Sequence, residues 1–492
     1  MNNEINFFAE TTFRNQRKRF GVRIDDRFRH IYVVGKTEMG KTAMMMNMAI
    51  QDIQNGHGIG FVDPHGETAE KLLDFIPSHR INEAVYFNLA DMAYPISLNV
   101  VEKTDSKYFH LIASNINGIF KKIWPDIWSS KIEYILNNCI FALLEYPNST
   151  LLGINRMLAD SDYRKKIADK VSDPLVRAFW VQEYPKYVQK YETEAIAAIQ
   201  NKFGQLVSAS LIRNTIGQLK SSISIREIID KEKILIVNLS KEEIGEEKAY
   251  FLGGLLITKL QIDVLSKTDS SEEQRKKFFL YIDEFQNFAT ERFADILTEA
   301  KKFRIGLVLG HQYLAQVDNK IKEAIFENMG TIIAFRVGAE DAQFLAREFI
   351  PEFDVDDLVN LAKYNIYLKL MINGMTSRPF SAETLPPIAP PKESNKEKII
   401  KLSREKYGGL SNIIEGKISR WSEKKELLKK ASYLPLMLYS VKCAVCQKEI
   451  KTMFKPDGTK PVYCKTCLNK RKVLPSIKAP TVPKKRIFKT EG

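Results

Sequence analysis

Phosphate chemistry is indicated by one short run, GKTEMGKT at residues 35–42. The pattern Gly-x4-Gly-Lys-Thr forms a loop whose backbone N–H groups surround the phosphates of a nucleotide. Its lysine neutralises phosphate oxygens, and its threonine hydroxyl binds Mg²⁺. The sequence therefore predicts a site for ATP with Mg²⁺, made of Gly35, Lys36, Thr37, Glu38, Met39, Gly40, Lys41 and Thr42.

A pair of acidic residues after an apolar run would complete such a site. Asp283 and Glu284 end the apolar part of FFLYIDEF at 278–285. Beside a phosphate-binding loop, Asp283 would hold Mg²⁺, and Glu284 would act as general base on the attacking water. The alternative is a strand that ends in two solvated acids.

Two other strand ends carry polar residues with weaker signals. Gln312 follows the run GLVLGH at 306–311, where a glutamine can contact the γ-phosphate and sense its loss. A polar strand terminus is the alternative. The segment DPHG at 63–66 is a strand end and a turn, for which turn chemistry alone explains Asp, Pro and Gly. Two interpretations stay open: Asp63 lies near the nucleotide, or the segment is a structural turn in which His65 caps a helix.

Four of the five cysteines form two CxxC pairs near the end of the chain, namely Cys443, Cys446, Cys464 and Cys467. In a reducing compartment, two such pairs predict a Zn²⁺ site, here a small zinc ribbon with a hairpin around PDG at 456–458. The metal would organise a segment too small to fold on its own core. Lysines in the ribbon suit DNA phosphates, but such ribbons also bind proteins. Cys139 lies in an apolar helical stretch and is expected in the core.

Apolar, strand-like runs recur along the chain and would position these residues. They lie at 30–35, 58–66, 234–240, 278–285, 305–312, 331–338 and 365–374. Several are continuous rather than alternating, as strands buried on both faces are, and helical stretches lie between most of them. This rhythm predicts an open α/β sheet. Residues 103–230 show helical periodicity and few strand signals, so we expect an all-helical insertion between the second and third strands.

Basic charge is concentrated in the C-terminal fifth. Residues 392–492 contain 26 Lys or Arg against 9 Asp or Glu, whereas residues 1–391 contain 48 against 51. A basic segment favours a polyanion, either nucleic acid or an anionic membrane surface, over a merely solubilising tail. Residues 399–432 have the pattern of a charged helix, and we expect 478–492 to be disordered. No apolar run reaches 18 residues and the start is polar, so we expect neither a transmembrane segment nor a signal peptide.

The sequence resembles the FtsK/HerA superfamily of ring ATPases, and within it the type IV secretion coupling proteins of conjugal DNA transfer. Over roughly residues 27–385 the resemblance rests on GKTEMGKT, FVDPHGE, WSSKIEYILNNCIFALLE, DPLVRAFW, YIDEFQNF, EAKKFRIGLVLGHQY and FRVGAEDAQFLA. It implies a RecA-like P-loop NTPase core with an all-helical domain. It also implies a homo-hexamer that moves DNA through a central channel by hydrolysing ATP.

Two departures from the family pattern matter. Coupling proteins usually begin with transmembrane helices, and no such segment is expected in this sequence. The chain is therefore expected in the cytoplasm, where it would reach the inner membrane through partners or work away from it. The family commonly has an arginine at the position of Lys301, which acts on the γ-phosphate of the neighbouring subunit. Lysine lacks the planar fork of arginine. Arg304 and Arg336 are therefore further candidates for the cation that acts on the neighbouring subunit. In the phosphate-binding loop, Glu38 is expected to point outward towards the subunit boundary.

Together these features predict an ATPase that couples ATP hydrolysis to DNA translocation, of the type IV secretion and conjugation type. DNA and relaxase or secretion-channel proteins are the expected partners. One alternative is a HerA-like DNA-end-processing motor paired with a nuclease, and another is a coupling ATPase that recruits protein substrates. A nucleotide-controlled scaffold with slow turnover is disfavoured by the intact pair of Asp283 and Glu284.

The expected order of domains follows from these patterns. It is an N-terminal segment at 1–26, the ATPase core at 27–102 and 231–385, the helical insertion at 103–230, a Pro-rich linker and charged helix at 386–440, the zinc ribbon at 441–472 and a basic tail at 473–492.

Overall fold

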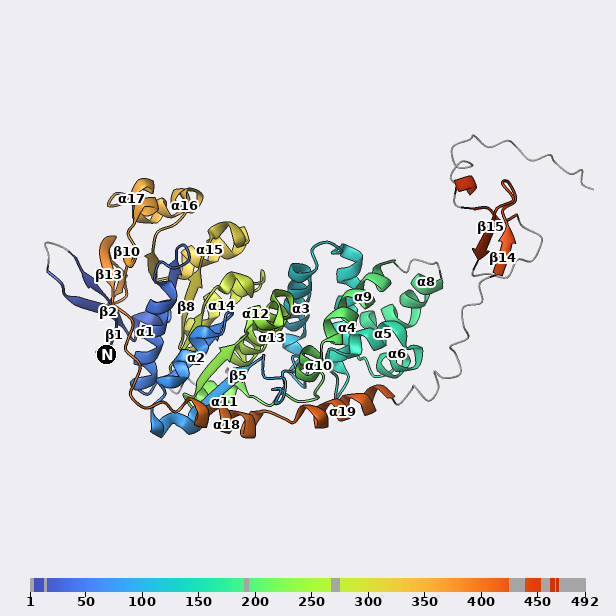
Figure 1. Cartoon of the computed structure of the whole chain (residues 1–492), viewed down its shortest axis with the longest axis horizontal. Coiled ribbons are helices and arrows are strands. Elements are labelled where there is room, and N and C mark those ends of the chain that lie inside the picture. The colour runs from blue at the N-terminus through green and yellow to red at the C-terminus, as the bar shows by residue number, and fades with distance from the viewer. Residues whose placement is uncertain are drawn as a thin grey trace, which may run out of the picture. The chain divides into compact units, whose positions relative to one another are not determined.

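The computed structural model of the chain describes residues 4–12, 16–189, 194–266, 275–423, 439–452, 461–464 and 466–468 (Figure 1). The chain divides into two compact units, residues 1–418 and residues 419–492. The first unit contains a large sheet with its helices, and the second contains the CxxC pairs. The expected tail at 478–492 lies outside the described residues.

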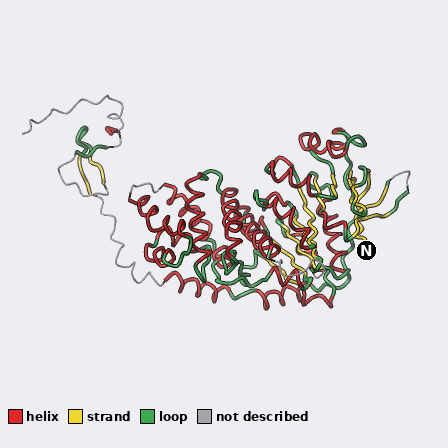
Figure 2. Tube along the Cα trace, turned by 180° about the vertical axis from the view of Figure 1, so that it is seen from behind, coloured by secondary structure: helices red, strands yellow, loops and turns green. Residues whose placement is uncertain are grey.

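The described strands of the first unit, yellow in Figure 2, form one large sheet. It has eleven strands, in the order β2-β1-β13-β10-β9-β3-β8-β7-β4-β6-β5. The strands from β9 to β5 are parallel, and β10, β13, β1 and β2 join them as antiparallel neighbours. The strands are β1 Ile5–Thr11, β2 Arg19–Arg23, β3 Ile31–Val34, β4 Gly58–Asp63, β5 Ala84–Asn88, β6 Ile234–Asn238, β7 Phe278–Ile282, β8 Ile305–His311, β9 Thr331–Ala334, β10 Asn365–Lys369 and β13 Phe380–Thr384. A small ribbon, β11 Met371–Ile372 with β12 Met375–Thr376, extends from β10.

The central strands form where the sequence is continuously apolar. Every residue of β3, β4, β6, β7, β8 and β9 is buried, because helices cover both faces of a parallel sheet. All seven expected runs contain strands, and the expected α/β class is confirmed. Four strands at or near the two ends of the sheet, β1, β2, β5 and β13, were not expected. Their burial alternates or their ends are polar, so their apolar signal is weak.

Nineteen α-helices accompany the strands in the described residues. They are α1 Lys41–Gln54, α2 Glu67–Asp74, α3 Phe109–Ile123, α4 Ser130–Glu145, α5 Gly153–Ala159, α6 Ser161–Ala168, α7 Pro174–Ala178, α8 Tyr184–Gln189, α9 Glu194–Ser208, α10 Ser210–Ile216, α11 Ile225–Asp230, α12 Lys241–Ile244, α13 Glu246–Leu265, α14 Phe293–Glu299, α15 Asn319–Asn328, α16 Ala339–Phe349, α17 Val355–Asn360, α18 Lys396–Tyr407 and α19 Ser411–Glu423.

Two sets of helices cover the sheet. Helices α1 and α2 pack on β4, β6 and β8, and α18 packs on β5. On the opposite face, Tyr32 of β3 packs edge-on against Phe285 and Phe326, and Phe285 stacks on Phe293 of α14. The long helix α13 continues from this layer to the helical segment, where it packs along α3.

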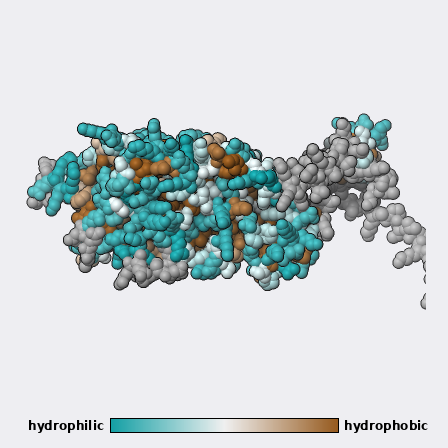
Figure 3. Space-filling view, turned by 90° about the horizontal axis from the view of Figure 1, so that it is seen from below, coloured by the Kyte–Doolittle hydropathy of each residue, from teal (hydrophilic) through white to brown (hydrophobic). Residues whose placement is uncertain are grey.

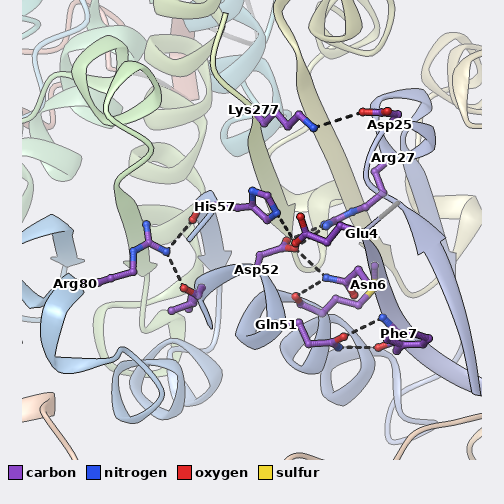
Figure 4. A network of polar contacts seen from close by, with 12 residues as sticks. Glu4, Asn6, Phe7, Asp25, Arg27, Gln51, Asp52, His57, Arg80 and Lys277 are labelled. Atoms are coloured by element: carbon purple, nitrogen blue, oxygen red, sulfur yellow. Dashed lines mark hydrogen bonds and ion pairs between the residues drawn. The ribbon is translucent and has the colours of Figure 1, made fainter. Parts of the chain in front are cut away.

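A buried ion pair joins the P-loop helix to the rest of the core (Figure 4). Two parallel hydrogen bonds of 2.6 and 2.8 Å link the Arg27 guanidinium to the Asp52 carboxylate, and both side chains are 1% exposed. Asp52 also accepts from Asn6 of β1 at 2.9 Å and from Tyr281 of β7 at 2.6 Å. Charges buried this deeply persist only when fully paired. The network therefore holds α1, β1 and β7 in one rigid body.

Among the described residues between β5 and β6 all the regular elements are helical, as was expected for residues 103–230. Because β5 lies before them, they follow the third strand of the core and not the second. Their core contains Cys139, which is fully buried, as expected for a small apolar side chain. Burial also raises the pKa of its thiol.

The expected charged helix at 399–432 is two helices, α18 and α19, because Gly408 and Gly409 interrupt it. Residues 424–432 lie outside the described part. Helix α18 is anchored to the core through Ser403, whose hydroxyl accepts from the Tyr86 N–H of β5 at 2.8 Å. Helix α19 reaches the helical segment, where Glu415 accepts from Asn214 at 3.1 Å. The two helices therefore connect the strand β5 of the core to the helical segment.

The second unit contains a short hairpin, β14 Tyr439–Lys442 with β15 Glu449–Thr452. This hairpin encloses the first CxxC pair, and the hairpin expected around PDG at 456–458 lies outside the described residues.

The surface shown in Figure 3 is mostly hydrophilic, and its hydrophobic residues form separate small patches. Single exposed apolar side chains are ordinary on protein surfaces and need no partner to explain them. Within the described parts of the chain, no helix is both long enough and apolar enough to span a bilayer.

Candidate functional site

The expected nucleotide loop lies at the carboxyl edge of the parallel sheet. It connects β3 to α1, and its backbone is tied to neighbouring strand ends: the Gly35 N–H donates to His311 at 3.2 Å, and the Lys36 N–H donates to Arg336 at 2.8 Å. The strand order places β8, β7, β4 and β6 in succession beside β3. Residues that follow these strands therefore meet the loop at one edge, where α/β sheets bind ligands.

Both framing glycines are required by the space around them. A Cβ on Gly35 would lie 2.5 Å from the Cβ of Phe335, and one on Gly40 would lie 2.8 Å from the Tyr364 ring. Gly40 also has φ 114°, which other residues rarely adopt. Glu38 has φ 60° and an exposed side chain, in keeping with the outward orientation that we expected. The side chain of Met39 is buried in the core.

Thr42 and Asp283 meet across the site. The Thr42 hydroxyl donates to the Asp283 Oδ2 at 2.7 Å, and Asp283 is 4% exposed at the end of β7. Lys41 is also buried, and its Nζ donates to the Lys36 carbonyl of its own loop at 2.8 Å. Burial lowers the pKa of Lys41, although the carboxylates of Asp283 and Glu284 act in the opposite direction. A hydroxyl, a carboxylate and a lysine arranged in this way form the donor set of a Mg²⁺–nucleotide site.

Glu284 follows Asp283 with φ 46° and accepts three side-chain hydrogen bonds. His65 Nε2 donates to its Oε1 at 3.1 Å, while Lys241 Nζ and Asn287 Nδ2 donate to its Oε2 at 2.9 and 3.0 Å. Partial burial would raise the pKa of Glu284, but the hydrogen bonds from His65 and Lys241 outweigh it and hold the pKa at about 2.

His65 is a charged group at neutral pH. The hydrogen bond to Glu284 is the main reason that the pKa of His65 rises to about 9, and a second hydrogen bond from Nδ1 to Glu242, at 2.6 Å, adds to it. Asp63 is buried and accepts from the backbone N–H groups of His65 and Ala69, at 3.0 and 2.9 Å. Asp63 therefore shapes the turn, whereas His65 contacts the acidic strand end.

Sequence reasoning left His65 open and missed Lys241. The sequence carried no signal for these contacts, because they depend on the order of strands: His65 follows β4 and Lys241 follows β6, and these strands lie in succession on one side of β7. Gln312 follows β8, between the loop and Asp283 in the strand order. Its neighbour His311 is fully buried and bonds through Nδ1 to the Tyr32 hydroxyl at 2.6 Å.

The three cationic candidates lie at two different edges. Arg304 directly precedes β8, so it lies at the amino edge, opposite the loop, and its Nη1 donates to the Arg275 carbonyl at 3.3 Å. Lys301 is exposed at the same edge and lines a cavity with His30, which directly precedes β3. Arg336 follows β9, and its carbonyl accepts from Lys36, so it lies beside the loop of its own chain.

The second unit brings its four cysteines together. The sulfur atoms of Cys443, Cys446, Cys464 and Cys467 lie within 4.8 Å of one another. Those of Cys446 and Cys464 are 3.7 Å apart, and a tetrahedral site with Zn–S bonds of about 2.3 Å places sulfurs roughly 3.8 Å apart. Backbone N–H groups, first that of Cys446, lower the pKa of Cys443 to about 6, which favours the thiolate that binds zinc. The donor set therefore fits Zn²⁺.

Comparison with known families identifies the chain. A family model described as "Type IV secretion-system coupling protein DNA-binding domain" matches residues 21–362, well over half of the sequence. The protein belongs to the type IV secretion coupling protein family. A second model, "Probable treble clef zinc finger", matches residues 437–472. The expected four-cysteine zinc site is thus confirmed. Its fold is that of a treble clef zinc finger and not the zinc ribbon that we expected. A search of the curated proteins gave no match.

Solved structures share the fold at low sequence identity. The bacterial conjugative coupling protein TrwB, without its first 70 residues, is 15% identical with a TM-score of 0.53, over 76% of this chain and 87% of that chain. TrwB in complex with ADP and Mg²⁺ is 16% identical with a TM-score of 0.53, over 76% and 89%. VirB4 of Thermoanaerobacter pseudethanolicus is 10% identical with a TM-score of 0.52, over 78% and 98%. These matches confirm the expected fold of the coupling ATPases.

Proposed function

We propose that this coupling protein is an ATP-driven DNA translocase of the type IV secretion and conjugation type. The observation that carries the proposal is the contact between Thr42 and Asp283, at 2.7 Å, with Lys41 and Glu284 beside it. The proposal is supported by the position of these four residues at one edge of the sheet. The family to which the chain belongs is named for DNA binding, which supports DNA as the transported polymer.

The residues present fit ATP with Mg²⁺. Thr42 and Asp283 would hold the metal, which neutralises charge on the phosphates when bound. The backbone of residues 35–40 and the Lys41 ammonium would hold the phosphates, and the dipole of the 14-residue helix α1 favours negative charge at this end. Glu284 would accept a proton from the attacking water, and Gln312 would orient that water or sense the γ-phosphate.

A homo-hexameric ring would place a cation from one subunit against the nucleotide of the next. Lys301 and Arg304 support this arrangement because they lie at the edge of the sheet opposite their own loop. Arg336 lies beside its own loop and is better placed to act within its subunit. The DNA would be held through its phosphates without reading of bases, so the motor would work on many sequences.

The domain boundaries expected from the sequence remain part of this proposal. The helical segment at 103–230 would grip DNA beside the ATPase core, and the zinc finger would recruit DNA or protein to the ring. A relaxase and secretion-channel proteins are the partners that this role implies.

The test is the ATPase rate of the full chain with single-stranded DNA, with double-stranded DNA and without DNA, at several salt concentrations. Stimulation by DNA that weakens as salt rises would support the proposal, since phosphate contacts release counterions. The variant Lys41→Ala controls for contaminating ATPases. Hydrolysis that no DNA stimulates, together with stimulation by a protein partner, would contradict it.

A further inference from the structure

Glu284 is held by two charged side chains that both come from one side of its strand. It follows β7, which has β8 and β3 on one side and β4 and β6 on the other. The loop follows β3. Its two charged partners come from the opposite side, since His65 follows β4 and Lys241 follows β6. Both charged donors therefore hold the carboxylate from the side of β7 opposite to the strand that carries the loop.

Both carboxylate oxygens of Glu284 are already engaged. His65 Nε2 donates to Oε1 at 3.1 Å, and Lys241 Nζ donates to Oε2 at 2.9 Å. A general base must offer an oxygen to the water that it activates, and geometry decides before basicity does. Charge-assisted hydrogen bonds are about twice as strong as neutral ones, so water competes poorly with these two donors. This arrangement is that of a resting site.

Lys241 is connected to the helical segment through α12 and α13. Lys241 is the first residue of α12, a single turn, and Gly245 with φ 91° joins this turn to α13. The first turn of α13 is bonded to the end of α3, because Trp124 Nε1 donates to Glu247 Oε1 at 2.8 Å. Further along, Gly254 packs so closely on Ile119 of α3 that a Cβ would lie 2.8 Å from that side chain. A shift of α3 would therefore move α13.

A second connection reaches the other side of Glu284. Lys122, also on α3, donates from its Nζ to the carbonyls of Gln286 and Ala289. These carbonyls belong to the turn that directly follows Glu284. Helix α3 thus contacts both the segment that follows the base and α13, which is joined through Gly245 to the helix that carries Lys241.

We propose that Lys241 and His65 clamp Glu284 in a resting position, and that DNA bound by the helical segment opens this clamp by shifting α3 and α13. The inference rests on the proposed function, because it concerns when that same site hydrolyses ATP. Lys241 and His65 are positioning residues, since they act through Glu284. The clamp would suppress hydrolysis when no DNA is bound.

Two substitutions test the clamp in the full chain without DNA. Lys241→Met and His65→Gln each remove one charged donor, so each should raise kcat about tenfold at unchanged KM, the population shift that loss of one such hydrogen bond gives. Stimulation by DNA should shrink in proportion. Lys241→Arg keeps a cationic donor and should restore the low basal rate. The matched control is Lys231→Met, because Lys231 forms an exposed ion pair with Glu227 and not with Glu284.

The connection to the helical segment has its own test. Trp124→Phe removes the donor to Glu247 and leaves the clamp residues unchanged. It should keep the basal rate and reduce DNA stimulation at least threefold, an effect within the usual range of coupling energies. DNA stimulation equal to that of the wild type would overturn the connection through α13.

The outcomes separate this inference from the proposed function. A lower kcat in both Lys241→Met and His65→Gln, at unchanged KM and melting temperature, would overturn the clamp, because the two residues would then assist the base. If Lys241→Met fails to fold, His65→Gln decides alone. A wild-type chain that hydrolyses ATP but never responds to DNA would overturn the proposed function instead.

Discussion

The Thr42 hydroxyl donates to the Asp283 carboxylate across 2.7 Å, although 241 residues separate them in the sequence. The contact joins the start of α1 to the end of β7, and it brings the two groups that would share Mg²⁺ into one place. It holds because β3 and β7 lie in one parallel sheet with only β8 between them.

The first prediction concerns this contact. Thr42→Ala and Asp283→Asn should each lower kcat/KM for ATP about 100-fold, the scale on which one electrostatic contact to a transition state acts. Thr42→Ala should also raise the Mg²⁺ concentration needed for half-maximal activity, whereas Thr42→Ser should not. Steady-state ATPase assays over a Mg²⁺ series measure both. Full activity of Asp283→Asn at low Mg²⁺ would show that this carboxylate does not hold the metal.

The second prediction concerns the buried pair of Arg27 and Asp52. Arg27→Met leaves the Asp52 carboxylate buried without its guanidinium, which should lower the free energy of unfolding by about 3–5 kcal/mol. Denaturation in urea, followed by tryptophan fluorescence, measures the change. Arg17→Ala is the control, since Arg17 forms an exposed pair with Glu10 and its loss should change little.

A loss of stability in Arg27→Met no larger than that in Arg17→Ala would show that the network is not a structural anchor. Asp52→Asn should destabilise as well, because Arg27 would then be buried without an anionic partner.

The third prediction concerns the charge of His65. Its pKa is raised to about 9, chiefly by Glu284, so the ion pair should contribute full stability below about pH 6.5 and lose it as pH rises through 9. The difference in unfolding free energy between wild type and His65→Gln should therefore shrink over this range. NMR titration of the imidazole gives the pKa directly. Titration of His65 near its ordinary value of about 6.5 would contradict the hydrogen bonds described.

The fourth prediction concerns the zinc finger. Removal of metal by a chelator should unfold residues 437–472, since the free energy of metal binding stabilises the folded state of such small domains. Basal ATPase activity should persist, because the nucleotide site lies wholly in the first unit. Limited proteolysis and zinc analysis before and after chelation measure this, and Cys443→Ser should mimic it. Free thiol reactivity of all four cysteines without a chelator would contradict the metal site.

The sequence was sufficient for the central strands and for the residues at their ends. Continuous apolar runs identify β3 and β7, and Lys41, Thr42 and Asp283 follow fixed motifs. The partners of Glu284 could not be predicted, because they depend on the order of strands in the sheet. His65 and Lys241 are 176 residues apart in the chain and meet at Glu284 only because β4 and β6 are neighbours.

Edge elements were missed for a different reason. Strands β1 and β13 pair near one end of the sheet, so few of their residues are fully buried and their apolar pattern is weak. The break between α18 and α19 could have been predicted from Gly408 and Gly409, since glycine is unfavourable inside a helix.

The most direct test of the central claim is displacement of a bound block from DNA by the full chain with ATP. The substrates are streptavidin on the end of single-stranded DNA and a third strand on double-stranded DNA. The account predicts that wild type displaces at least one block at a rate that depends on ATP. Glu284→Gln should bind ATP and displace neither, because loss of a general base lowers hydrolysis by about 10²–10⁴. DNA-stimulated hydrolysis without displacement of either block would contradict translocation.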